Sequence, residues 1–208
     1  MIFGIALYSC GIYMTIQANL GLSSWDALHM GINYTTGISF GNASVLVGLF
    51  ILVADVLLGE KIGFGTIINT IMIGKFVDLL DYIELLPKME SLFLGLLLLI
   101  AGLVIICFGM YFYMNAALGG GPRDSLMVAF HRKLPTVPIG LMRALLEGAA
   151  LLSGWLLGGP VGIGTLVAVL SIGFIMQGVF TLVHFDPKAV QHESLMVTVK
   201  RIRTAQKI

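Results

Sequence analysis

The sequence predicts an all-α integral membrane protein: six transmembrane helices in two inverted-topology repeats of three, each repeat with a short broken or re-entrant helix after its first span. Composition is the first reason for this prediction. Of 208 residues, 58% are hydrophobic and 11% are charged. A soluble domain carries about 25% charged residues, so this composition indicates a chain that resides in lipid. An internal repeat and an uneven distribution of Lys and Arg predict how the helices are arranged.

The chain contains two similar halves. Residues 11–32 match residues 109–130 at an offset of 98, with seven identities. Residues 57–78 match residues 156–177 at an offset of 99, with eight identities. An internal repeat of this kind indicates a duplicated architecture. We therefore divide the chain into repeat 1 (1–90), repeat 2 (91–184) and a polar cytoplasmic tail (185–208).

Six stretches are long and apolar enough to cross about 30 Å of hydrocarbon as helices. They lie near 2–20, 42–59, 64–82, 92–116, 138–157 and 163–184. Each repeat contributes three of them. Between the first and second span of each repeat lies a segment too short to cross the membrane, and we expect short helices over 23–34 and 121–132.

Each short helix begins with recognisable start signals. In repeat 1, Ser23 is the expected N-cap and Asp26 stands at the third helical position, a carboxylate variant of the capping box. In repeat 2, Gly121 is the expected N-cap, followed by Pro122 at the first helical position and Asp124 at the third. Both segments follow a Leu-Gly pair, in which Gly can close the preceding helix.

Two interpretations of the short helices are open. They can lie flat at the interfaces, with Trp25 at headgroup level and the two aspartates only satisfying backbone N–H groups. Alternatively, they dip inward from opposite faces and bring two positive helix ends toward the midplane, which favours an anion or a carboxylate. The expected ligand-binding residues are then Asn19, Ser23, Ser24, Asp26, Gly120, Gly121, Arg123 and Asp124.

Charged residues inside apolar spans normally face the protein interior and form pairs. Lys75 and Asp78 are spaced i,i+3, and Arg143 and Glu147 are spaced i,i+4, so each couple can form an ion pair on one helix face. The alternative role of these four residues is a proton or ion coupling site. We expect Asp55, near the end of its span, to reach the interface or to pair with Lys61.

The basic residues predict the orientation. With a cytoplasmic N-terminus, nine Lys and Arg residues fall inside and Lys88 alone falls outside, a strong positive-inside bias. The nine are Lys61, Arg123, Arg132, Lys133, Lys188, Lys200, Arg201, Arg203 and Lys207. Both termini are then cytoplasmic. Because three spans per repeat is an odd number, the second repeat enters the membrane from the opposite side.

Several functional classes lack support in the sequence. The net charge of +1 gives no reason to expect a nucleic-acid partner. The two cysteines, Cys10 and Cys107, lie in apolar runs and suit small buried hydrophobes. We interpret the scattered histidines, His29 among them, as interfacial or capping residues. We therefore expect no metal, no cofactor, no catalytic residues and no enzymatic activity.

The stretch ANLGLSSWDALHMGI, followed by GFGTIINTIMIGKFVDLL, resembles the YczE/YitT-like family of bacterial integral membrane proteins, and within it the YczE branch. The most specific parts of the resemblance are residues 20–26 and 63–66, and it covers nearly the whole chain. It implies a multi-pass protein of the bacterial cytoplasmic (inner) membrane. It implies no substrate.

Two functions remain in view. The first is a small secondary transporter or permease for an anionic or zwitterionic solute, suggested by the inverted repeat and the paired short helices. The second is a non-transporting membrane factor that acts through its basic cytoplasmic face on a biosynthetic or regulatory partner. The expected partners are the lipid bilayer and a small-molecule solute, and six short helices are also compatible with a homodimer.

Overall fold

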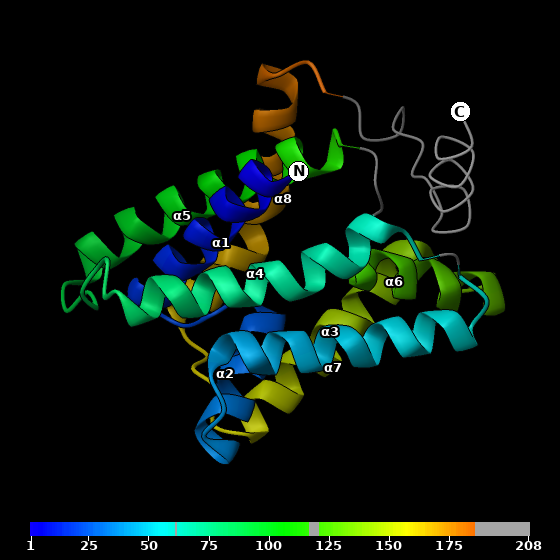
Figure 1. Cartoon of the computed structure of the whole chain (residues 1–208), viewed down its shortest axis with the longest axis horizontal. Coiled ribbons are helices and arrows are strands. Elements are labelled where there is room, and N and C mark those ends of the chain that lie inside the picture. The colour runs from blue at the N-terminus through cyan, green and yellow to red at the C-terminus, as the bar shows by residue number, and fades with distance from the viewer. Residues whose placement is uncertain (61, 117–120, 186–208) are drawn as a thin grey trace, which may run out of the picture.

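The computed structural model describes residues 1–60, 62–116 and 121–185, and within these ranges all regular structure is helical (Figure 1). Eight helices follow one another in these ranges: α1 (Ile2–Gln17), α2 (Ser24–Thr36), α3 (Phe40–Leu57), α4 (Phe64–Tyr82), α5 (Leu92–Met114), α6 (Pro122–Lys133), α7 (Ile139–Leu156) and α8 (Ile163–Leu182). Lys61, Gly119, Gly120 and the tail from residue 186 onward lie outside the described residues.

The order of the helices repeats with the offset seen in the sequence. The short helix α6 begins 98 residues after α2, and α7 and α8 each begin 99 residues after α3 and α4. The two short helices are therefore present where the N-cap signals predicted them, with 13 and 12 residues. Each half thus has the same sequence of elements: a long helix, a short helix and two long helices.

Four helices of the described chain are long and apolar enough to cross a membrane: α3, α5, α7 and α8. The other two expected spans do not meet the same criteria. Helix α1 is apolar but has only 16 residues, a length of about 24 Å. Helix α4 has 19 residues but carries Lys75, Asp78 and Asp81.

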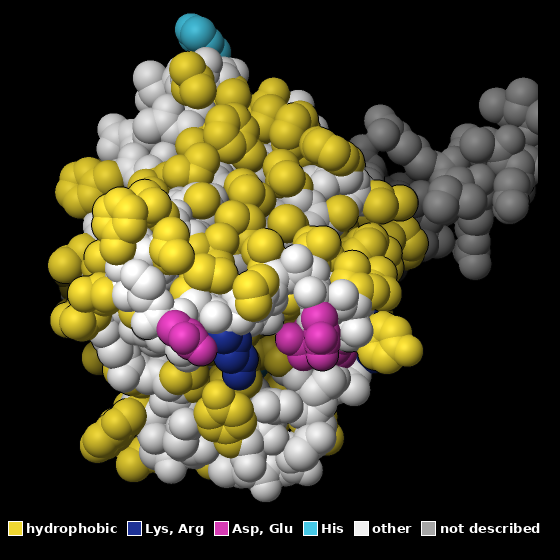
Figure 2. All heavy atoms as spheres, turned by 90° about the vertical axis from the view of Figure 1, so that its left-hand side faces the viewer, with side chains coloured by type: hydrophobic (Ala, Val, Ile, Leu, Met, Phe, Trp, Pro, Cys, Tyr) yellow, Lys and Arg dark blue, Asp and Glu magenta, His cyan; other side chains and the backbone are white. Residues whose placement is uncertain are grey.

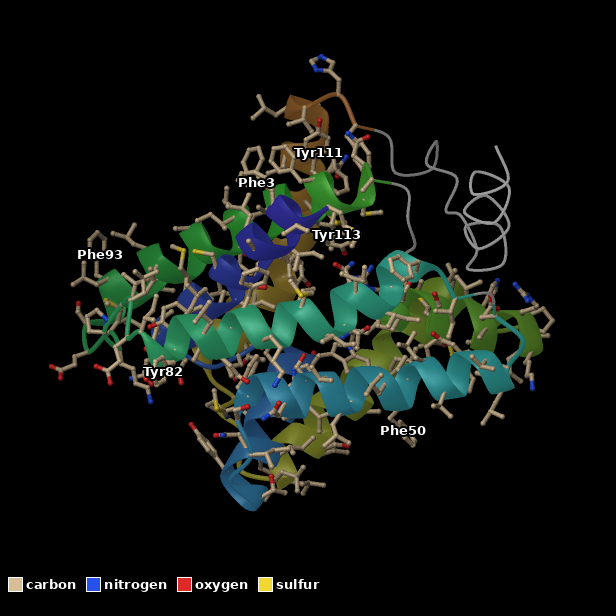
Figure 3. All side chains as sticks on the ribbon, viewed as in Figure 1. Phe3, Phe50, Tyr82, Phe93, Tyr111 and Tyr113 are labelled. Carbon is tan, nitrogen blue, oxygen red and sulfur yellow. The ribbon has the colours of Figure 1, made fainter. Side chains whose placement is uncertain are left out.

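Large apolar side chains cover the outside of the molecule. Phe3, Phe50 and Phe93 project outward from α1, α3 and α5, whereas Tyr113 of α5 lies inside the assembly of helices (Figure 3). In the view of Figure 2, apolar side chains cover most of the face, and acidic and basic side chains form only a small group. A surface of this kind suits contact with lipid chains and would be unfavourable in water.

The interior is built on α1 and α5, which pack closely in antiparallel directions. A Cβ atom on Gly11 would lie 2.7 Å from the carbonyl oxygen of Gly102, and one on Gly4 would lie 2.9 Å from that of Gly109. The residue numbers rise along one helix as they fall along the other, so the two helices are antiparallel. The repeat offset of 98 residues converts each contact into the other, because Gly4 corresponds to Gly102 and Gly11 to Gly109.

The remaining helices surround this pair in a nearly symmetrical way. Helix α4 packs on α1 as α8 packs on α5, and α2 packs on α7 as α6 packs on α3. One contact breaks the symmetry: α3 packs along α4, whereas their described counterparts α7 and α8 barely touch. The two halves therefore share their elements but differ in how tightly the last two helices are joined.

The Gly-x-Gly-Thr turn before α8 holds the loop that precedes α2. The N–H of Gly164 donates to the carbonyl oxygen of Leu20 at 2.7 Å, and the N–H of Leu22 donates to that of Pro160 at 2.9 Å. Gly21 adopts a φ of 104°, a conformation that favours glycine. The turn therefore positions the start of α2.

Candidate functional site

The starts of the two short helices have the residues that the sequence predicted. Ser23 is the N-cap of α2, and Gly121 is the N-cap of α6, with Pro122 at its first position. Asp26 and Asp124 stand in the first turns. Neither N-cap accepts a side-chain hydrogen bond from the helix, since the Ser23 hydroxyl instead donates to the Asp26 carboxylate at 2.6 Å. The positive end of each helix is therefore left uncapped by its own N-cap side chain.

Both helix starts line a pair of adjoining cavities at the centre of the molecule. The first cavity has a volume of about 180 Å³ and the second about 220 Å³. Their shared lining residues are Tyr8, Ile12, Trp25, Asp26, Met110, Arg123, Arg143 and Glu147. Pockets for drug-sized ligands measure about 300–1,000 Å³, so these cavities suit a smaller solute.

A polar cluster of three residues joins the two repeats where the cavities meet. The Trp25 indole Nε1–H donates to Glu147 Oε1 at 3.1 Å. The Arg123 guanidinium lies 4.9 Å from the centre of the Trp25 ring, a cation–π contact. Trp25 comes from α2, Arg123 from α6 and Glu147 from α7. Trp25 is 9% exposed and hydrogen-bonded inside the protein, so its side chain does not lie on the protein surface.

The two arginines of the cavities have no carboxylate within ion-pair distance among the described residues. In this part of the chain, ionisable side chains of opposite type approach within 4.0 Å only between His29 and Asp26 and between Arg132 and Glu60. Arg143 and Glu147 both line the cavities but do not form the ion pair that their spacing predicted. Arg123, which was counted among the inside charges for the orientation, lines both cavities. Two guanidinium groups thus remain available to an anionic ligand.

Two buried polar side chains of the first cavity lack hydrogen-bond partners. His29 is 1% exposed and Asn69 is 4% exposed, and neither the His29 ring nitrogens nor Asn69 Oδ1 has a partner among the described residues. Buried polar groups are normally hydrogen-bonded, so such groups in a cavity wall indicate a place for a polar ligand. The expectation that His29 is interfacial or capping is therefore wrong.

The charge states of the buried pair on α2 follow from burial. Burial, and after it the positive charge of Arg123, holds the pKa of His29 well below its usual value. Burial also raises the pKa of Asp26, while Arg123 and the Ser23 hydrogen bond act in the opposite direction. His29 is therefore neutral, and its 3.8 Å approach to Asp26 is not an ion pair between full charges.

The structure brings most of the predicted ligand-binding residues to the cavities. Asp26 and Arg123 line both cavities, Ser23 and Ser24 line the second, and Gly121 and Asp124 line the first. Gly120 lies outside the described residues. Asn19 is not in either lining: its Nδ2 donates to the carbonyl oxygen of Met89 at 3.3 Å, away from the short helices.

Lys75 and Asp78 lie away from the cavities and do not pair with each other. Asp78 accepts hydrogen bonds from Ser39 Oγ at 2.6 Å and from the Gly41 N–H at 2.7 Å. Lys75 Nζ donates to Asn42 Oδ1 at 2.6 Å. Both side chains are thus turned toward the start of α3, where a carboxylate satisfies free donors of a helix N-terminus.

Sequence reasoning missed the contributions of α1, α4 and the end of α5. Tyr8, Asn69 and Tyr113 line the first cavity although each stands in a segment interpreted only as a span. These three residues belong to no sequence motif and are uncharged polar residues, so the motif and charge patterns did not indicate them. The available signal was positional: a Tyr or Asn in a membrane span needs a polar partner and therefore tends to face the interior.

Comparison with known proteins places this architecture in a family. The model of a family of unknown function, DUF6198, matches residues 1–181. The uncharacterized membrane protein YczE of Bacillus subtilis is 32% identical over 178 residues, 84% of this chain and 80% of that protein. An uncharacterized protein of Haemophilus influenzae is 30% identical over 177 residues, 85% of this chain and 80% of that protein. The uncharacterized protein YyaS of Bacillus subtilis is 32% identical over 190 residues, 89% of this chain and 94% of that protein. No solved structure gives a significant match.

Proposed function

Because the chain belongs to the family of unknown function DUF6198, whose similar relative YczE is named a membrane protein, we propose a function from its cavities. The protein is a multi-pass inner-membrane permease for a small anionic or zwitterionic solute. The observation that carries this proposal is the shared lining of the two cavities, where the starts of α2 and α6 meet Arg123 and Arg143. The proposal includes no catalytic step.

The chemistry of the lining favours a carboxylate or a similar oxyanion as the bound group. The guanidinium groups of Arg123 and Arg143 have no carboxylate within ion-pair distance among the described residues, and the helix starts add positive partial charge. Asp26 and Glu147 stand in the same lining and can bind a positive group of the solute. A zwitterion such as an amino acid satisfies both sets of residues, and a simple anion satisfies the arginines.

The arrangement of the helices supports an inverted repeat of six spans. Helices α1 and α5 are antiparallel, and their glycine contacts exchange under the offset of the repeat. In the proposed arrangement α1 and α4 complete the set of spans, with α1 shielded by α5 and α4 by α3. The short helices then enter from opposite faces and meet at the cavities, and both termini are cytoplasmic.

The alternative function, a factor acting through a basic cytoplasmic face, has weaker support. Arg132, which belongs to that face, pairs with Glu60 at 3.1 Å and is partly neutralised. The permease proposal places the solute on residues of α2, α6 and α7, so solute binding should survive removal of residues 190–208.

Trp25 provides a direct test, because it lies in the cavity lining and the chain has only two tryptophans. The variant Trp155→Phe removes the other indole, which is exposed. Purified protein would be titrated with glycine, glutamate, lactate, phosphate and sulfate, with Trp25 emission as the readout. We expect a saturable change with at least one of these solutes, and uptake of that solute by proteoliposomes.

Arg123→Gln and Arg143→Gln should weaken this binding at least tenfold, since a charge-assisted hydrogen bond contributes about 1.5–3 kcal/mol. The matched control is Lys88→Gln, which removes a positive charge from the loop between α4 and α5 and should leave solute binding unchanged. An absence of any saturable response, or equal affinity in the arginine variants, would contradict the proposal.

A further inference from the structure

Asp55 of α3 is a buried carboxyl group that the proposed permease site does not use. Its side chain is 0% exposed, and neither carboxylate oxygen has a hydrogen-bond partner among the described residues. Ile51 and Leu58 lie four residues before and three residues after it, on the same helix face. Both pack in one apolar cluster with Leu126 and Phe130 of α6. Asp55 therefore stands at the apolar contact between α3 and α6; Lys61, the partner that the sequence suggested, lies outside the described residues.

The other repeat has a glycine at this position. Gly154 stands fifteen residues after the first residue of α7, as Asp55 does after the first residue of α3. Gly154 lets α2 approach closely, because a Cβ there would lie 2.5 Å from the Leu28 backbone nitrogen. The position equivalent to Asp55 in repeat 2 is thus occupied by a residue without a side chain. A carboxyl group in the equivalent contact is a specific feature of the first repeat.

None of the described charged groups on the neighbouring helices forms a hydrogen bond or an ion pair with the Asp55 side chain. On α6, Arg132 pairs with Glu60 at 3.1 Å, His131 contacts the Val137 carbonyl oxygen at 2.9 Å and Arg123 lies on the Trp25 ring. The other ionisable residues of α6 are Asp124, which lines the first cavity, and Lys133, which is exposed. On α4, Lys75 and Asp78 contact the opposite end of α3, and on α2, Asp26 and His29 face each other.

An ionised carboxylate in such surroundings is strongly disfavoured, because burial removes its hydration and no donor among the described residues replaces it. The neutral acid is compatible with an apolar contact. We propose that Asp55 is a proton-binding site in the contact between α3 and α6, and that α6 must move away from α3 for the proton to leave. In that step the O–H bond of the acid breaks, the proton passes to water, and the carboxylate becomes hydrated.

This site is linked to the cavities through α6. The helix that covers Asp55 carries Arg123 near its N-terminus, where it lines both cavities. The Glu60–Arg132 ion pair joins the ends of α3 and α6 next to Asp55 (α3 and α6 are side by side in Figure 1). Displacement of α6 would therefore move an arginine of the solute site. That coupling rests on the proposed permease function, whereas the proton site does not.

Infrared spectroscopy of the full-length protein in lipid tests the proton site. A neutral carboxylic acid has a C=O stretching band that a carboxylate lacks. At neutral pH we expect a band that disappears in Asp55→Asn and in Asp55→Leu, the second variant being suited to the apolar surroundings if the first fails to fold. Asp78→Asn is the control, because the Asp78 carboxyl group has two hydrogen-bond donors, unlike that of Asp55, and its loss should leave the band in place. A spectrum unchanged by either Asp55 variant would overturn the proposal.

Spin labels test the movement of α6. Leu57→Cys on α3 and Val128→Cys on α6 place labels on exposed positions, in a background where Cys10 and Cys107 are replaced by Ala. A rise from mildly acidic to alkaline pH should lengthen the distance between the labels, and Asp55→Asn should abolish that change. A pH-independent distance in the parent protein would overturn the link to α6. If Trp25 responds to none of the solutes, the permease proposal fails while the infrared result still decides the proton site.

Discussion

Trp25 shows at the scale of a single residue how one side chain can join both repeats. Its indole N–H bonds to Glu147 of α7, and its ring face supports the guanidinium of Arg123 from α6. A tryptophan has both a donor and an extended apolar face, so it can make both contacts at once.

Trp25→Phe should therefore destabilise the protein although it preserves an aromatic ring. The substitution removes the indole donor to Glu147, whose side chain is partly buried, and a typical hydrogen bond contributes about 0.5–1.5 kcal/mol to stability. We expect a lower melting temperature by circular dichroism. The matched control is Trp155→Phe, whose side chain is exposed and should change stability by no more than about 0.5 kcal/mol. Equal melting temperatures for the two variants would show that the Trp25–Glu147 bond contributes nothing.

At the scale of the helix, close packing of α2 on α7 holds the cavity residues together. Gly154 and Gly31 let the backbones of the two helices approach, because a side chain on either would meet the other helix within 2.7 Å. Trp25 and Glu147 belong to these same two helices. The geometry of the cavity thus depends on glycine positions that do not line it.

Gly154→Ala should push α2 away from α7. The added Cβ would lie 2.5 Å from the Leu28 backbone nitrogen, and overpacking of this kind costs about 1–3 kcal/mol. In the Trp155→Phe background we expect a lower melting temperature and a red-shifted Trp25 emission, since the indole loses its enclosure.

Gly148→Ala on the same helix is the control for this prediction. A Cβ there meets nothing within 4 Å, and alanine favours a helix by about 1 kcal/mol over glycine. This variant should be neutral or slightly stabilising. If both alanine variants behave alike, the α2–α7 contact is not as tight as described.

At the scale of the whole molecule, the proposed inverted topology predicts that the two loops after the short helices lie on opposite sides of the membrane. Thr36 and Thr136 mark these loops and are exposed. In a background without Cys10 and Cys107, a membrane-impermeant maleimide should label Thr36→Cys on intact cells. Thr136→Cys should be labelled only after permeabilisation. Labelling of both positions on intact cells would reject the inverted arrangement.

The sequence predicted the helices well because the signals for their ends are local. Ser23, Gly121 and Pro122 act within one turn, and the repeat offset aligned the elements of the two halves. The spans α1 and α4 were expected from apolar runs, but length and charge set them apart from the other four.

The candidate site was predicted only in part, because its contacts join residues distant in sequence. Trp25 and Glu147 are separated by 122 residues, and no short-range pattern specifies that bond. The predicted ion pair between Lys75 and Asp78 does not form, for a related reason. Spacing allowed it, but the free N–H of Gly41 and the hydroxyl of Ser39 bind the Asp78 carboxylate instead.

The unequal joining of the last two helices in each half has a consequence for solute exchange. Suppose that the two repeats exchange conformations, so that the solute site opens first to one side of the membrane and then to the other. The two conformers then differ in free energy, because the present packing of α3 on α4 is kept in only one of them. The empty protein would then spend most of its time facing one compartment. Few protein molecules would be open to the other compartment, so a solute on that side would bind with a weaker apparent affinity.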